Sequence, residues 1–189
     1  MTGMENESGD AAAIRASRRD PAAFAEVFDR HFASVHAFAR RRVGGDLADE
    51  IASETFTRAF DLRARYDVSV ADARPWLLGI ASNLMRRHWR SERRRLAAYA
   101  RHGATAGGGV PLPGEDAAAL AGALDGLRKD ERDVLFLYAL ADLSYEEIAL
   151  ALDIPIGTVR SRLSRARRRL REALAPDPPP REIEESANV

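Results

Sequence analysis

Two stretches of the chain concentrate guanidinium groups, which bind phosphate. Ile154 to Leu174 holds seven arginines and one acid, and Asn83 to Arg95 holds six arginines and one acid, although the net charge of the chain is zero. Arginine pairs with phosphate oxygens through two parallel hydrogen bonds, and a basic face attracts a polyanion. The sequence therefore predicts two faces that attract a polyanion, and the alternative for either stretch taken alone is a solvated helix face.

The first face lies on a predicted helix after Pro155. Its apolar residues recur three or four positions apart, as on one side of a helix: Ile156, Val159, Leu163, Ala166, Leu170 and Ala173. Hydroxyl and guanidinium groups fill the other side near the start of the helix: Thr158, Arg160, Ser161, Arg162, Ser164 and Arg165. These groups can donate to base edges and phosphates.

The second face lies on a helix that Pro75 is suited to open. An amide and four guanidiniums share one side of it: Asn83, Arg86, Arg87, Arg90 and Arg94. The amide can pair with a base edge, and the guanidiniums can hold phosphates. Trp76 falls on the buried side with Leu77, which favours a core role. For Trp89, packing in the core and stacking on a base both remain open.

The residue inventory argues against an enzyme. The four histidines lack metal-ligand spacing with carboxylates, the chain has no cysteine, and the glycine-rich stretch at 105–114 lacks the lysine of a phosphate-binding loop. We therefore expect no catalytic residue, no metal and no cofactor. Short apolar runs, no export signal and no cysteine predict a cytoplasmic protein without membrane insertion.

Helical periodicity covers two blocks separated by a stretch rich in glycine and proline. The fold class predicted is all-α, with two small helical domains and a flexible linker. The predicted boundaries are a disordered N-terminus (1–20), a first domain (21–99), a linker (100–116), a second domain (117–175) and a disordered acidic tail (176–189). Residues 115–153 carry ten acids and three bases, which suggests an acidic scaffold between the basic faces.

The second block has the pattern of a helix-turn-helix. Ser144 and Glu147 have the spacing of a capping box, so a helix should begin at Tyr145. Pro155 disfavours a helical residue before it and suits the first turn of the next helix. In this motif the N-terminal end of the second helix meets base edges in the major groove.

An acidic side distinguishes the helix predicted in "LADEIASETFTRAF". Ile51, Thr55, Phe56 and Phe60 should point inward, and Asp49, Glu50 and Glu54 outward. Taken alone, such a side serves solubility.

The second block, "LRKDERDVLFLYALADLSYEEIALALDIPIGTVRSRLSRARRRL", resembles domain four of bacterial sigma factors of the extracytoplasmic-function (ECF) group. "LADEIASETF" is similar to their region 2.2, and "PWLLGIASN" with its arginines is similar to regions 2.3 and 2.4. Ser53 stands where the family usually has glutamine.

The resemblance implies an alternative sigma factor, with core RNA polymerase, promoter DNA and an anti-sigma factor as partners. Asp49, Glu50 and Glu54 would face the β′ clamp helices, and the second domain would contact the β flap. The Asn83 face would bind the minus-ten element, with a flipped base held by Asn83 and the loop Asp67–Ala73. The helix after Pro155 would bind the minus-35 element.

A stand-alone helix-turn-helix regulator is the alternative. It would bind an operator without polymerase, and it leaves the Asn83 face unexplained.

Overall fold

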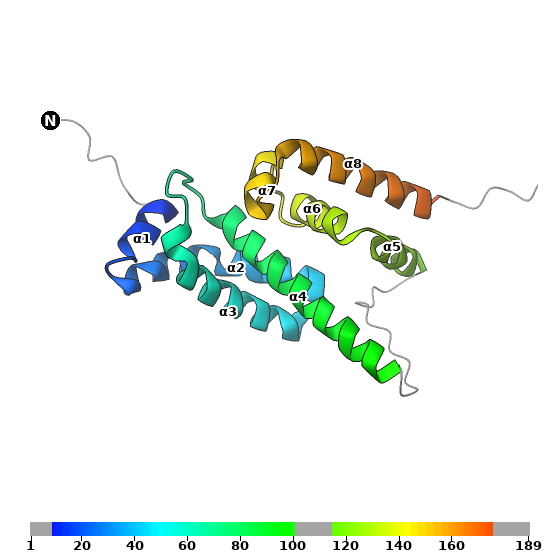
Figure 1. Cartoon of the computed structure of the whole chain (residues 1–189), viewed down its shortest axis with the longest axis horizontal. Coiled ribbons are helices and arrows are strands. Elements are labelled where there is room, and N and C mark those ends of the chain that lie inside the picture. The colour runs from blue at the N-terminus through cyan, green and yellow to red at the C-terminus, as the bar shows by residue number, and fades with distance from the viewer. Residues whose placement is uncertain (1–8, 101–114, 176–189) are drawn as a thin grey trace, which may run out of the picture.

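The computed structural model describes residues 9–100 and 115–175, which are helical and contain no strand (Figure 1). The eight α-helices found there are α1 (Asp10–Ala16), α2 (Ala25–Val43), α3 (Gly45–Leu62), α4 (Arg74–Ala100), α5 (Glu115–Asp125), α6 (Lys129–Ala139), α7 (Tyr145–Leu152) and α8 (Ile156–Ala173). Short 3-10 helices cover Pro21–Phe24 and Arg63–Arg65. The all-α prediction is confirmed. Within these ranges, no helix has the length and apolarity needed to cross a membrane.

The first domain packs α2 and α3 against each other and both against α4 (Figure 1). Val35 and Phe38 of α2, Phe56 of α3 and Leu77 of α4 are buried between them. Three of the four inward positions predicted for α3 are fully confirmed, because Ile51, Thr55 and Phe56 are buried, and the fourth, Phe60, is partly buried. Trp76 is partly buried, and its ring centroid lies 5.0 Å from that of Tyr66.

Helix α1 corrects the prediction that residues 1–20 are disordered. Ile14 is fully buried, and Ser17 Oγ donates a hydrogen bond to the Ile14 carbonyl (2.7 Å). The helix has only seven residues, too few to be stable alone, so packing against the domain must hold it in place. The predictions for the N-terminal eight residues, most of the linker and the acidic tail lie outside the described residues.

The second domain places α7 and α8 in a helix-turn-helix over α6. The capping box is present: Ser144 Oγ accepts from Glu147 N at 3.2 Å, and Glu147 Oε2 accepts from Ser144 N at 2.7 Å. Asp153 ends α7 with a φ of 52°, a left-handed conformation that asparagine and aspartate tolerate better than most residues. Val159, Leu163 and Ala166 are buried as predicted, whereas Ala173 at the end of the stripe is exposed.

The two domains touch where α7 crosses α4 (Figure 1). A Cβ atom on Gly79 would lie 2.0 Å from the carbonyl oxygen of Ala151, far inside van der Waals contact. Glycine at this position therefore lets the two helix backbones approach closely. The second domain is held directly against α4, the helix that carries Asn83.

Candidate nucleic-acid interface

The N-terminal half of α8 presents a mixed row of hydroxyl and guanidinium groups. Arg160, Ser161 and Ser164 are exposed, and Thr158 is partly exposed. Ser161 Oγ donates to the Thr158 carbonyl at 3.1 Å, which ties it to the helix backbone. None of the described residues pairs with the Arg160 guanidinium. Arg160 is thus available for a ligand beside α8.

Arg162 and Arg165, predicted for the same surface, are engaged by carboxylates of α6. Arg162 Nε lies 3.0 Å from Asp130 Oδ2, and Arg165 Nε lies 3.3 Å from Glu131 Oε1. Arg169 also pairs with Glu131, at 3.1 Å. The Glu131 side chain is only 1% exposed, so it serves as a buried partner for two arginines. The acidic block thus neutralises part of the basic face, which the charge pattern predicted only as a scaffold between the faces.

The predicted Asn83 face is divided in the structure. Asn83, Arg87 and Arg90 are exposed on α4. Arg86 instead turns toward the second domain, where its Nη2 lies 2.9 Å from Asp133 Oδ2. This corrects the prediction that Arg86 shares one free face with Asn83, because helical spacing cannot show a partner on another domain. The Arg94 side chain is not among those that the structure describes.

Hydrogen bonds within residues 66–70 fix the shape of the loop Asp67–Ala73. Asp67 Oδ1 accepts from Ser69 N (2.9 Å) and Ser69 Oγ (2.7 Å), and these hydrogen bonds lower the pKa of Asp67. The Tyr66 hydroxyl donates to the Val70 carbonyl at 2.6 Å, and burial raises the pKa of Tyr66, which keeps the donor protonated. These hydrogen bonds fix the shape of the loop that leads into α4, and the buried Tyr66 side chain holds its start in the first domain.

Asp10 of α1 anchors the end of this loop. Its Oδ2 accepts from Ala73 N at 2.8 Å and contacts His31 Nε2 at 2.6 Å, and Arg30 pairs with Oδ1. Burial opposes ionisation of Asp10, but the hydrogen bonds from Ala73, His31 and Arg30 outweigh it and lower its pKa. Sequence reasoning missed this contact, since no local pattern joins residues so far apart in the chain.

The same cluster brings together groups that could ligate a metal. Ligand atoms of Asp10, His31 and Asp72 lie within 4.8 Å of one another, although sequence spacing predicted no such group. Arg30 already supplies a positive charge to Asp10, and Asp72 Oδ1 accepts from Arg74 N at 2.8 Å. Anchoring of α1 and of the loop accounts for these residues.

The acidic residues predicted on α3 lie on its outer side. Asp49 and Glu50 are exposed and Glu54 is partly exposed; the Asp49 side chain is 78% exposed and contacts His36 Nε2 at 2.8 Å. Glu54 pairs with Arg58 one turn along the helix, at 2.7 Å. These carboxylates can receive a basic partner because surface ion pairs such as these contribute little energy and exchange readily.

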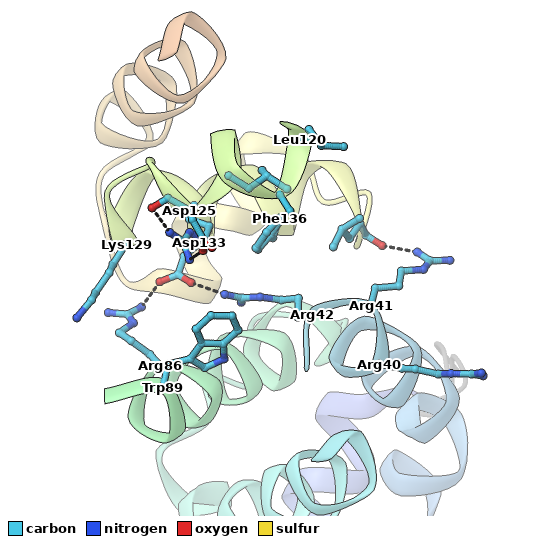
Figure 2. A pocket seen from close by; sticks show the side chains of 14 residues that line it. Arg40, Arg41, Arg42, Arg86, Trp89, Leu120, Asp125, Lys129, Asp133 and Phe136 are labelled. Carbon is cyan, nitrogen blue, oxygen red and sulfur yellow. Dashed lines mark hydrogen bonds and ion pairs between the residues drawn. The ribbon is translucent and has the colours of Figure 1, made fainter. Parts of the chain in front are cut away.

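A groove separates the two domains beside the Arg86–Asp133 pair (Figure 2). It has a volume of about 550 Å³ and is bounded by α2, α4, α5 and α6. The Asp133 side chain is 4% exposed and receives Arg42 Nη2 at 2.9 Å in addition to Arg86. Burial lowers the pKa of Arg42, and the carboxylate of Asp133 opposes that effect. Trp89 is partly buried and lines this groove.

Comparison with known families assigns both halves of the chain. Residues 27–95 match the family described as Sigma-70 region 2, and residues 117–170 match Sigma-70, region 4. The ECF RNA polymerase sigma factor SigC of Mycobacterium tuberculosis is 31% identical over 179 residues, which cover 93% of this chain and 96% of that protein. The RNA polymerase sigma factor CarQ of Myxococcus xanthus is 33% identical over 157 residues, covering 80% of this chain and 89% of CarQ.

Two solved structures share the fold. The sigma factor RpoE of Bartonella quintana, in complex with the anti-sigma factor NepR, has a TM-score of 0.61 at 26% identity and covers 82% of this chain and 98% of its own. CnrH, in complex with the cytosolic domain of CnrY, has a TM-score of 0.63 at 26% identity. The match covers 89% of this chain and 99% of CnrH.

Proposed function

This chain belongs to the sigma-70 family of RNA polymerase sigma factors, in the ECF group, and on that basis we propose how its surfaces share the work of transcription initiation. The protein is a transcription initiation factor that acts with core RNA polymerase and directs promoter recognition. The family is not enzymatic.

The N-terminal half of α8 reads the minus-35 element as duplex DNA. The observation that carries this assignment is the exposed Arg160 among the hydroxyls of Thr158, Ser161 and Ser164, at the end of the helix that enters a major groove in this motif. Arg162 and Arg165 lie behind that row and hold α6 as well as reaching toward DNA. They join the interface as phosphate contacts.

The exposed part of α4 binds the minus-ten element. Asn83 offers an amide to a base, while Arg87, Arg90 and Arg94 offer guanidiniums to the backbone. A rise of about 1.5 Å per residue places Asn83 about 14 Å along α4 from Arg74, where the anchored loop enters the helix. An extruded base needs a preformed pocket, and we assign one side of that pocket to the loop. The hydrogen bonds of Tyr66 and Asp10 hold the loop in place.

The acidic side of α3 is the surface for core RNA polymerase. Asp49, Glu50 and Glu54 would face basic residues of the β′ clamp helices, and the second domain would contact the β flap. Core polymerase and promoters reside in the cytoplasm, so we place the protein there. Because RpoE was solved in complex with the anti-sigma factor NepR, we also infer an anti-sigma factor for this chain.

Run-off transcription with purified core polymerase tests this function. Transcripts from promoters bound by the protein should appear only when both components are present. Promoter binding by the protein without any transcript, and without co-purification with core, would favour the stand-alone regulator instead.

A further inference from the structure

The interdomain groove combines an apolar wall with a basic rim. Figure 2 shows Arg42 of α2 and Arg86 and Trp89 of α4 facing Phe136 of α6 across it. Six basic and two acidic residues line the groove: Arg40, Arg41, Arg42, Arg86, Lys129, Arg132, Asp125 and Asp133. An occupant should therefore be acidic and carry an apolar group.

Some of the guanidinium nitrogens at the groove lack an acceptor. Among the described residues, Arg42 Nη1, Arg86 Nε and Arg132 Nε are buried without a hydrogen-bond partner. The Arg42 side chain is 8% exposed, so water reaches it poorly. These three nitrogens are closed to any occupant as well as to water, so an acidic occupant of the groove would accept instead from exposed guanidinium nitrogens, such as those of Arg86, whose side chain is 35% exposed.

We propose that the acidic tail of this chain, residues 176–189, lies in the interdomain groove. The tail carries four acids and one arginine, and Ile183 stands between Glu182 and Glu184. The carboxylates would accept from the arginines of the rim, and Ile183 would cover the apolar wall. We assign the groove to this segment because its negative charge is complementary to the basic rim.

The position of α8 puts the tail within reach. Glu172 and Ala173, near the end of α8, line a hollow together with Ala119 and Gly122 of α5, and other residues of α5 line the groove. The tail therefore starts about one helix diameter, roughly 10 Å, from the groove. Fourteen residues can span about 46 Å when extended, so the tail can pass around α5.

A tail in the groove would contact both domains. It would add contacts on both sides of the Arg86–Asp133 pair. This inference concerns the position of the tail and is independent of the role in transcription.

The test uses the two tryptophans of the full chain and one spin label. The chain has no cysteine, so Ser186→Cys provides a single attachment site for a nitroxide. Trp89 lies in the groove, whereas Trp76 packs against Tyr66, thirteen residues or about 20 Å earlier on α4. The label should broaden the indole N–H signal of Trp89 and leave that of Trp76 sharp.

A charge-reversed tail provides the comparison. Glu182→Lys, Glu184→Lys and Glu185→Lys together should abolish the broadening of Trp89, while Asp177→Lys close to α8 should leave it. Equal broadening of both signals, no broadening of Trp89, or broadening that survives the triple reversal would overturn the proposal. Broadening seen only between a labelled chain and a separate isotope-labelled chain would assign the groove to a second copy and would overturn it too.

Discussion

Arg86 Nη2 and Asp133 Oδ2 lie 2.9 Å apart, although the two residues belong to different domains. The same carboxylate holds Arg42, so one side chain of α6 joins α2 and α4 to the second domain. The pair occupies Arg86 Nη2, so only the other nitrogens of this guanidinium could contact promoter DNA while the pair is intact. If α4 binds the minus-ten element as proposed, the arrangement of the domains and that binding should be coupled through Asp133.

Asp133→Asn should separate the domains without unfolding either one. Loss of one partner of a buried ion pair costs about 3–5 kcal/mol, but domain separation would return Arg42 to water and relieve that cost. Small-angle scattering should show a larger radius of gyration, with the helical circular dichroism unchanged. Asp130→Asn is the matched control, since its pair with Arg162 lies within one domain. Equal dimensions for wild type and Asp133→Asn would contradict the coupling.

Reversal of charge on α3 should abolish binding to core polymerase. The double substitution Glu50→Arg with Glu54→Arg removes the Glu54–Arg58 ion pair. Such a pair between residues one helical turn apart contributes about 0.2–0.5 kcal/mol to stability. Co-purification with core should be lost while the helical signal stays. Glu26→Arg on α2 reverses an exposed acid elsewhere and should leave binding intact. Retention of core by the double variant would exclude this surface.

Arg160→Ala should change sequence preference at one position of the minus-35 element. A bidentate base contact is worth about 1–3 kcal/mol of discrimination. Arg168 lies eight residues further along α8, away from the end that meets base edges, so Arg168→Ala should remove a phosphate contact and weaken all sequences alike. Affinities for a set of single-base variants of the element separate the two patterns. A sequence-independent loss of affinity for both substitutions would show that α8 contacts only the phosphate backbone of the DNA.

Asn83→Ala should impair formation of the open complex. The amide would stabilise an extruded base, so its loss matters once the DNA is unpaired. Holoenzyme with the variant should form closed complexes on the upstream element and give a lower yield of open complex. A template already melted at the minus-ten element should rescue the yield in part, because the cost of unpairing is gone but the contact is still missing. Full activity on the closed promoter would leave Asn83 as a surface residue.

Acid should remove the contribution of Asp10 to stability. The pKa of Asp10 is lowered in the folded state, so its stabilisation is present above the ordinary value of 3.8 and is lost as the pH falls through the folded value. Asp10→Asn should therefore lower the melting temperature at pH 6, and the difference from wild type should shrink at pH 3. A difference that is the same at both pH values would mean that the charge of Asp10 contributes nothing.

Local chemistry explains which parts of the fold could be predicted from sequence. The start of α7 was predictable because Ser144 and Glu147 satisfy each other within one turn. The buried stripe of α8 followed from helical spacing, and the exposed acids of α3 did as well. Features formed by partners distant in sequence could not be predicted in the same way. Arg86 turns to Asp133, and α1 is held by the contacts of Ile14 and Asp10 with the rest of the domain.

The division of the α8 arginines had the same origin. Arg160 and Arg162 look alike in the sequence, yet only Arg162 has an acid of α6 beside it. The excess of acids in residues 115–153 was visible, but the side chains that each acid meets depend on how α6 packs under α8. Figure 1 shows that packing directly.

The carboxylates of α6 act as built-in counterions for α8. Arg162, Arg165 and Arg169 are already neutralised in part by Asp130 and Glu131, so fewer than seven positive charges of this helix region act on DNA. Each phosphate that a protein neutralises releases condensed cations and steepens the dependence of affinity on ionic strength. The second domain should consequently bind its element with a shallower salt dependence than its arginine content suggests. Its attachment to DNA would then persist through a rise in cellular salt that would release a helix with every arginine free.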